Sequence, residues 1–148
     1  MQPVGAEYQW YDGVSAEAIT DELVEVYQGV GHPPHVGDPF FSVASFRKRL
    51  DTAFASEGFE TVTSRRGGQI IGYLHGATLP ADEPWRTSLD HRRPAGLQGL
   101  AEAGQVFWLR ELMVLPEFQN QRLGRKIHDT TISGRAEIAT ALTCIIDN

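Results

Sequence analysis

The feature that most constrains the fold is an apolar run, VFWLRELMVL, at residues 106–115. Its branched and aromatic side chains favour a buried β-strand, and Pro116 ends the run because proline has no backbone N–H to donate. A helical pattern follows at residues 122–138, where Leu123 and Ile127 begin an apolar stripe. A strand, a proline turn, a polar loop and a helix therefore follow one another directly.

The rest of the sequence predicts further helices and strands. In chain order we expect a strand at 8–12, a helix capped by Ser15, a helix capped by Ser42, strands at 59–65 and 70–77, and a last strand at 140–146. Residues 66–69 read as a tight hairpin loop, which makes the middle of the sheet antiparallel. The strand–helix–strand order at the end predicts a parallel pair. The expected fold class is α/β of the mixed α+β kind, a central mixed sheet flanked by helices.

Composition limits the class of protein further. The chain has 148 residues, of which 41% are hydrophobic and 22% charged, as in ordinary globular proteins. A chain of this size buries about two-thirds of its unfolded surface, which is enough for one core. We therefore expect residues 1–148 to form one domain. Disorder, collagen-like repeats and disulfide scaffolds are excluded.

Charge and cysteine content bear on partners and location. The net charge of −6 disfavours a nucleic acid or an anionic membrane as a partner. The single cysteine, Cys144, forms no intrachain disulfide and is compatible with a reducing compartment. No apolar run reaches the length of a membrane span, and the N-terminus lacks the pattern of a signal peptide. These observations predict a cytoplasmic protein.

The start of the helix at residue 122 has the character of an anion site. The first N–H groups of a helix have no partner within the helix and carry partial positive charge. Arg122, Arg125 and Lys126 add three cations there, and Gly124 lets a ligand approach the backbone. A pyrophosphate suits such a site. The alternative is a solvated helix start without a ligand.

Residues 106–129 resemble motif A of the GNAT superfamily of acyl-CoA-dependent N-acetyltransferases. In that motif a strand ending in Val-x-Pro-x-aromatic precedes a Gln or Arg, two residues, Gly, one residue, and Gly or Ala. The matching positions here are Val114, Pro116, Phe118, Gln119, Asn120, Gln121, Arg122, Leu123 and Gly124. The order of the predicted elements also agrees with this family.

The resemblance implies transfer of an acetyl group from acetyl-CoA to a primary amine of a small molecule. The backbone of Met113 and Val114 would pair with pantetheine as an added strand. The segment from Gln119 through Asn120, Gln121, Arg122, Leu123 and Gly124 to Arg125 would hold the pyrophosphate. A backbone N–H near Val114 would stabilise the charge that develops on the thioester oxygen.

Glu111 is the candidate general base that the resemblance implies. Alternation along the strand places Glu111 and Met113 on one face and Leu112 and Val114 on the other. Burial among apolar neighbours would raise the pKa of Glu111, which suits a base. The alternative is an ion pair between Glu111 and Arg110, Arg122 or another nearby cation.

Two departures from the family pattern support a second hypothesis. Arg122 stands where the family usually has Gly, and the chain ends soon after the motif helix, where the family normally continues with a helix and two strands. The chain therefore resembles a C-terminally truncated GNAT fold. The alternative function is a degenerate, non-catalytic module that binds CoA or a partner chain. We expect a homodimer or a partner chain to cover the last strand, because an open strand edge invites pairing.

Other residues carry weaker signals. His32 and His35 read as loop residues rather than a metal pair, because two prolines separate them. His75 reads as a hydrogen-bonded sheet histidine, with an acid–base role as the alternative. Further candidates are His128 as a structural residue, Trp85 in an acceptor pocket or as a loop anchor, Cys144 in the core, and Asp82, Glu83 and Asp90 as attractors of a cationic amine or solvated carboxylates. No metal is expected.

Overall fold

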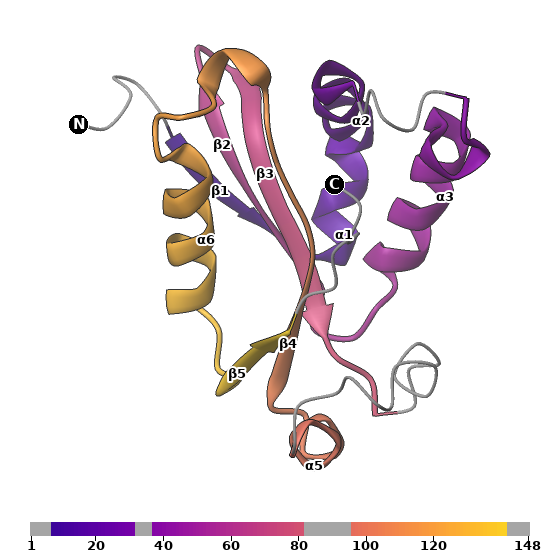
Figure 1. Cartoon of the computed structure of the whole chain (residues 1–148), viewed down its shortest axis with the longest axis vertical. Coiled ribbons are helices and arrows are strands. Elements are labelled where there is room, and N and C mark those ends of the chain that lie inside the picture. The colour runs from indigo at the N-terminus through magenta and orange to yellow at the C-terminus, as the bar shows by residue number, and fades with distance from the viewer. Residues whose placement is uncertain (1–6, 32–36, 82–95, 142–148) are drawn as a thin grey trace.

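The computed structural model describes residues 7–31, 37–81 and 96–141. Its centre is a sheet whose strands lie side by side in chain order (Figure 1). The strands are β1 (Glu7–Tyr11), β2 (Glu60–Arg66), β3 (Gln69–Thr78), β4 (Val106–Val114) and β5 (Ala139–Ala141). Strands β1 to β4 pair antiparallel, and β4 and β5 pair parallel. The predicted mixed sheet is confirmed.

Helices cover both faces of this sheet. The elements before β2 are α1 (Gly13–Ala16), η1 (Glu17–Ile19), α2 (Thr20–Val30), η3 (Pro39–Phe41) and α3 (Val43–Phe54). The later ones are α5 (Leu97–Glu102), η5 (Pro116–Phe118) and α6 (Leu123–Ser133). In Figure 1, α2 and α3 lie on one side of the sheet and α6 on the other. The mixed fold class is therefore confirmed.

The main core forms where the helices meet β3. The side chains of Leu23 on α2, Phe46 on α3 and Ile127 on α6 are all buried, and so are Tyr73 and Leu74 on neighbouring positions of β3. Because neighbouring strand residues point to opposite faces, β3 packs against helices on both sides. Burial of this apolar surface is the main stabilising contribution to the fold.

The predicted hairpin is confirmed. β2 ends at Arg66 and β3 begins at Gln69, so Gly67 and Gly68 form a two-residue loop. Their φ angles are 58° and 82°, the left-handed region that such loops require at both positions and that glycine adopts without steric cost. The loop sets the antiparallel register of β2 and β3.

An irregularity in the pairing of β3 with β4 shapes the site. His75 pairs with Glu111, but the next residue, Gly76, pairs with Leu109, so Arg110 is an extra residue in β4. Such a bulge redirects side chains and interrupts simple alternation. A Cβ atom at Gly76 would collide with the Trp108 carbonyl oxygen, so glycine is needed opposite the bulge.

The N-terminal boundary of the first helix differs from the prediction. Asp12, not Ser15, is the N-cap: its carboxylate accepts a hydrogen bond from the Ser15 N–H at 2.8 Å, and the Ser15 hydroxyl accepts one from the Asp12 N–H at 3.0 Å. This reciprocal capping starts the helix earlier than the apolar pattern indicates. The second predicted cap is confirmed, since the Ser42 hydroxyl accepts from the Ser45 N–H at 3.1 Å.

The helix predicted at 122–138 is shorter in the structure. It begins at Leu123 and ends at Ser133, and Ile138 is 74% exposed. The chain leaves the helix because the Ile138 N–H already donates to the Gln105 carbonyl, 3.1 Å away, beside the sheet. Of the last strand predicted at 140–146, the structure describes β5 at Ala139–Ala141, and residues 142–148 lie outside the described part.

Candidate active site

Glu111 lies at the centre of a hydrogen-bonded group on β3 and β4. Its Oε2 atom accepts a hydrogen bond from the Tyr73 hydroxyl at 3.0 Å and lies 3.0 Å from Nε2 of His75. The two partners come from β3, because register places Tyr73 opposite Met113 and His75 opposite Glu111. No described hydrogen bond uses Oε1 of Glu111, so this atom remains to take a proton.

The protonation of Glu111 differs from the prediction. Burial raises its pKa, but the hydrogen bond and charge of His75, the hydrogen bond of Tyr73 and the charge of Arg49 together lower the pKa below its ordinary value. The expected raised pKa is therefore wrong, because apolar neighbours alone do not describe this site. Burial raises the pKa of Tyr73, so its hydroxyl stays a donor at neutral pH.

The expected ion-pair alternative also takes a different form. The described ion-pair partner of the Glu111 carboxylate is His75 at 3.0 Å, and no described ion pair joins Glu111 to Arg110 or Arg122. Because an ionised carboxylate only accepts hydrogen bonds, Nε2 of His75 must carry the proton between them. Nδ1 of His75 is buried without a partner among the described residues.

A cavity of about 280 Å³ opens beside Glu111. It lies between β3 and β4 and the helices α2 and α3, and we call it the Glu111 cavity. Its lining residues are Tyr27, Phe40, Phe41, Phe46, Arg49, Leu50, His75, Trp108, Arg110, Glu111 and Met113. The bulge brings Arg110 and Glu111, neighbours in sequence, to the same cavity, which alternation does not predict.

Beyond the cavity, part of one edge of β4 has no strand partner among the described residues. Parallel pairing with β5 covers residues 106–108 of β4, and no described strand lies along residues 109–114 on that side. The Leu115 N–H donates to the Ile71 carbonyl on β3, so alternation directs the backbone polar groups of Val114 and Leu112 to the open edge and those of Met113 toward β3. These backbone groups can pair with an extended ligand.

The loop that joins β4 to α6 has an unusual backbone. Asn120 and Arg122 both have φ of 62°, a left-handed conformation that Asn tolerates and that is unfavourable for Arg. Arg122 is the N-cap of α6 but provides no capping hydrogen bond from its side chain. Arg122 stands where the family pattern has Gly, and its backbone conformation is one that glycine adopts at a lower conformational free energy.

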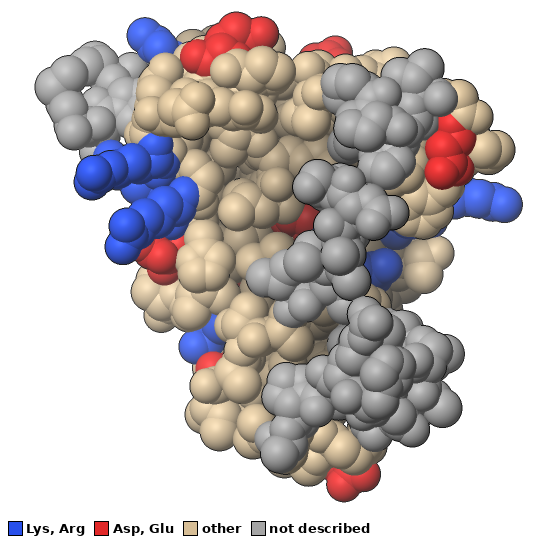
Figure 2. Space-filling view, viewed as in Figure 1, with Lys and Arg blue, Asp and Glu red and all other residues tan. Residues whose placement is uncertain are grey.

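Positive charge surrounds this uncapped helix start. Figure 2 shows Lys and Arg side chains gathered beside α6. Arg122 and Arg125 are exposed and Lys126 is partly exposed, and the described partner of Arg125 is Asp129 at 3.8 Å. Cations at a helix N-terminus are unfavourable because the helix dipole is positive there. An anion bound at this position would offset the repulsion.

The other predicted ligand residues divide between the surface and the core. Gln119, Asn120 and Gln121 are exposed, and the Gln119 amide donates to the Val114 carbonyl at 3.0 Å. Leu123 is buried, so its side chain anchors α6 and its backbone alone is available to a ligand. A Cβ at Gly124 would make only ordinary contact with Val114, so packing does not require glycine there.

The structure also places the weaker candidates. His75 takes part in the site, whereas His128 lies on α6 at 3.0 Å from Asp129. The described residues hold no cluster of three or more side chains suited to a metal ion. The candidates His32, His35, Asp82, Glu83, Trp85, Asp90 and Cys144 lie outside the described residues.

Sequence reasoning missed Tyr73 and Arg49. Tyr73 reads as an ordinary strand residue, and Arg49 as a polar position on a helix. The available signal was the alternation along β3, which places Tyr73 and His75 on one face. Nothing local to α3 indicates that Arg49 lines the same cavity.

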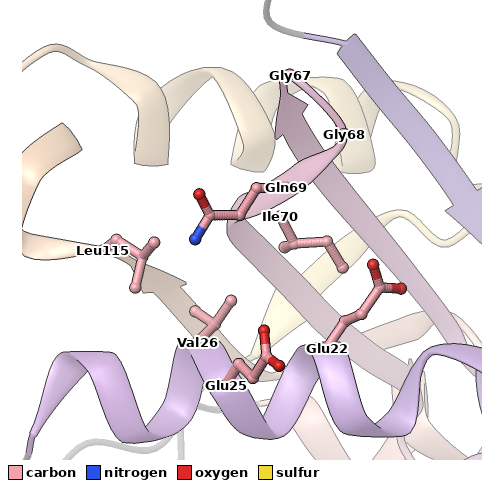
Figure 3. Close-up of a pocket in the computed structure, with 8 residues that line it drawn as sticks. All are labelled: Glu22, Glu25, Val26, Gly67, Gly68, Gln69, Ile70 and Leu115. Carbon is pink, nitrogen blue, oxygen red and sulfur yellow. The ribbon is translucent and has the colours of Figure 1, made fainter.

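A second cavity of about 350 Å³ lies between α2 and the β2–β3 hairpin (Figure 3). Glu22 and Glu25 project toward it from α2, and Gln69 and Ile70 line it from the hairpin. Glu22 is already paired with Arg65 at 2.8 Å. Its carboxylates make this cavity unsuited to a phosphate, and none of the predicted site residues lines it.

Comparisons with known proteins identify the fold. An aminoglycoside N-acetyltransferase, AAC(6')-Iy, in complex with CoA superposes with a TM-score of 0.62 and 11% identity, over 100% of this chain and 84% of that one. A second aminoglycoside acetyltransferase, from an uncultured soil metagenomic sample and in complex with sisomicin, gives 0.59 and 12%, over 97% and 80%. The ribosomal-protein-alanine N-acetyltransferase of Brucella melitensis gives 0.56 and 10%, over 95% and 81%.

These similarities show that the chain has the fold of the GNAT N-acetyltransferases, as the sequence resemblance predicts. No family model and no curated protein matches the sequence. Among the described residues, every helix is too short or too polar to traverse a lipid bilayer.

Proposed function

We propose that this protein is an N-acetyltransferase that transfers an acetyl group from acetyl-CoA to a primary amine of a small molecule. The observation that carries the proposal is the open edge of β4, which runs from the Glu111 cavity to the uncapped start of α6. A proton acceptor, a strand edge and an anion site thus follow one another along one element.

The open edge and the helix start form the donor half of the proposed site. The N–H of Val114 faces the edge that pantetheine would occupy as an added strand. The pyrophosphate would lie at the N-terminus of α6 with Arg122, Arg125 and Lys126 around it. Structures similar to this chain, including AAC(6')-Iy, contain CoA. The donor would therefore extend from the loop at residues 119–122 toward Glu111.

Glu111 has the position of a general base for the acceptor amine. Its lowered pKa keeps the carboxylate ionised at neutral pH and makes it a weaker base than the sequence predicts. It takes a proton from the ammonium group, directly or through a water molecule, and leaves a lone pair on nitrogen. The nitrogen then bonds to the thioester carbon, and the displaced electron pair on oxygen is stabilised by the Val114 N–H. When the C–S bond breaks, its electron pair leaves with sulfur, which takes the second amine proton. The proton on Glu111 passes to solvent.

Calorimetry with acetyl-CoA, followed by a thiol-release assay over a panel of small primary amines, tests this proposal. We expect saturable binding of acetyl-CoA and thiol release that depends on the amine. Desulfo-CoA is a control ligand that should bind without any release of thiol. Absence of binding at millimolar acetyl-CoA would rule out the proposed function.

A non-catalytic module is the second candidate, and the same open edge of β4 favours it. An exposed strand edge pairs with a strand of another chain as well as with pantetheine. In that case the protein forms a homodimer or binds a partner chain at residues 109–114. Sedimentation equilibrium with and without acetyl-CoA distinguishes the two candidates: a dimer that acetyl-CoA does not dissociate and that releases no thiol supports the module. The cytoplasmic location stays a prediction.

A further inference from the structure

The Glu111 cavity contains more positive than negative charge on its described lining. Arg49 reaches it from α3 and Arg110 from the bulge of β4, whereas Glu111 is its one described carboxylate. An acceptor with several ammonium groups would meet two guanidinium groups at close range. The described lining therefore favours a ligand that carries negative charge as well as an ammonium group.

The aromatic rings of the cavity are not arranged as a cage for a cation. The guanidinium carbon of Arg49 lies 4.1 Å from the centroid of the Phe40 ring, and that of Arg110 lies 4.6 Å from the Trp108 ring. These contacts occupy ring faces that would otherwise attract a substrate ammonium group. The aromatic lining instead offers apolar contact to the body of an acceptor.

Arg49 is held in place before any ligand binds. Its Nη1 atom donates to the Phe40 carbonyl at 2.6 Å and to the Ser45 hydroxyl at 2.9 Å, and Nη2 lies 3.5 Å from the Tyr27 hydroxyl. A guanidinium group has five N–H donors, so these described bonds use three of them. The other two suit a carboxylate, which a fixed guanidinium plane binds well.

We propose that the acceptor is an amine that also carries a carboxylate and an aromatic or large apolar group, as an aromatic α-amino acid does. The carboxylate binds the guanidinium groups at Arg49 and Arg110, the apolar group lies against the aromatic lining, and the ammonium group lies toward Glu111. This assignment rests on the proposed acetyltransferase function and specifies its acceptor class. The volume of about 280 Å³ suits a molecule of this size.

Two sets of matched ligands test the acceptor class. In the first, thiol release from acetyl-CoA is measured with L-phenylalanine, with phenethylamine, which lacks the carboxylate, and with spermidine, a polycation. In the second, ligand-observed NMR compares binding of N-acetyl-L-phenylalanine and N-acetylphenethylamine, and this measurement needs no turnover. We expect the carboxylate to improve both kcat/KM and affinity by about tenfold or more, since it adds charge-assisted hydrogen bonds. Spermidine should be the poorest acceptor.

Arg49→Gln should reduce the preference for the carboxylate ligand to about twofold or less. The matched control is Arg47→Gln on the same helix: Arg47 is exposed, pairs with Asp21 and does not line the cavity, so the preference should stay. Because Arg49 also supports η3, Arg110→Gln is a second variant with the same expected direction. Circular dichroism establishes that each variant is folded.

The outcomes separate the two proposals. If no amine releases thiol but N-acetyl-L-phenylalanine still binds better than N-acetylphenethylamine, the catalytic function fails, and the cavity keeps its preference for an aromatic carboxylate as a binding property only. If acetyl-CoA supports turnover but phenethylamine or spermidine is the better acceptor, the assignment is overturned and the function stands. Equal binding of the two acetylated ligands also overturns the assignment.

Discussion

The two ends of the open β4 edge are built in different ways. At one end, Glu111 is largely buried and is held by Tyr73 and His75 from the neighbouring strand. At the other, Asn120 and Arg122 adopt left-handed conformations in an exposed loop, and the helix that follows has no side-chain cap. The proposed acceptor end is therefore organised by packing, whereas the proposed donor end carries strain and positive charge that a bound anion would offset.

The contrast indicates that the start of α6, and not the surroundings of Glu111, would be stabilised by a bound ligand. Strand register and burial position the atoms around Glu111. At α6, like charges and unpaired N–H groups raise the free energy of the empty loop. Substitutions around Glu111 should therefore lower turnover. Substitutions at the start of α6 should change acetyl-CoA affinity and protein stability in opposite directions.

The largest expected effect is on turnover at the acceptor end. Glu111→Gln keeps the size of the side chain but removes the proton acceptor, so kcat should fall by about 10²–10⁴-fold. Acetyl-CoA affinity, measured by calorimetry, should stay unchanged. Glu117→Gln, an exposed change next to the loop, is the control and should retain activity. An unchanged kcat in Glu111→Gln would remove this residue from the mechanism.

The bulge that places Glu111 should be sensitive to its packing partner. In Gly76→Ala the new Cβ meets the Trp108 carbonyl oxygen and the Phe107 ring, so the free energy of unfolding should fall by about 3 kcal/mol. Urea unfolding measures this change. Gly99→Ala on α5 is the control, because its Cβ meets no atom within 4 Å and helix propensity should increase stability by up to about 1 kcal/mol. Equal stability of the two variants would refute a packed bulge.

At the donor end, affinity and stability should change in opposite directions. The double substitution Arg122→Gln and Lys126→Gln removes two cations that attract phosphate, so acetyl-CoA should bind about tenfold more weakly. The unliganded protein should become more stable by about 0.5–1 kcal/mol, because cations near a helix N-terminus are unfavourable. Calorimetry and thermal unfolding measure the two effects, and Lys48→Gln on α3 is the control. Losses of both affinity and stability would contradict the contrast.

The backbone strain of the loop predicts a smaller gain. Arg122→Gly introduces the one residue that adopts φ of 62° without a Cβ clash. The free energy of unfolding should therefore rise by about 1 kcal/mol. Arg125→Gly, within α6, should instead destabilise the protein by about 1 kcal/mol. Denaturant unfolding of the pair checks both signs. A loss of stability in Arg122→Gly would show that its side chain supports the loop.

The smallest effect should appear in the pH dependence of stability. The folded-state pKa of Glu111 lies below the unfolded value of about 4.3, so its ionisation stabilises the protein above that pH. This contribution is lost as pH falls through the folded pKa. The stability difference between the wild type and Glu111→Gln should therefore change as pH falls below about 4.3. The absence of any change below pH 4.3 would contradict the lowered pKa.

Much of the fold follows from local pattern. The apolar run before Pro116 predicts β4, and Gly67 and Gly68 predict the hairpin, because these signals depend on neighbouring residues. Helix ends were less predictable: Asp12 rather than Ser15 caps the first helix, and Ile138 lies beyond the end of α6. Those boundaries depend on capping bonds and on contacts with the sheet.

The sequence by itself determined that Glu111 and Met113 share one face of a buried strand and that cations gather at the next helix start. Only the tertiary structure decided that Tyr73 and His75 meet Glu111 and that Arg110 joins the same cavity. The physical reason is that alternation sets the face of a side chain, whereas register and bulges set its partners. Those partners, in turn, reverse the direction of the Glu111 pKa shift that burial alone would produce.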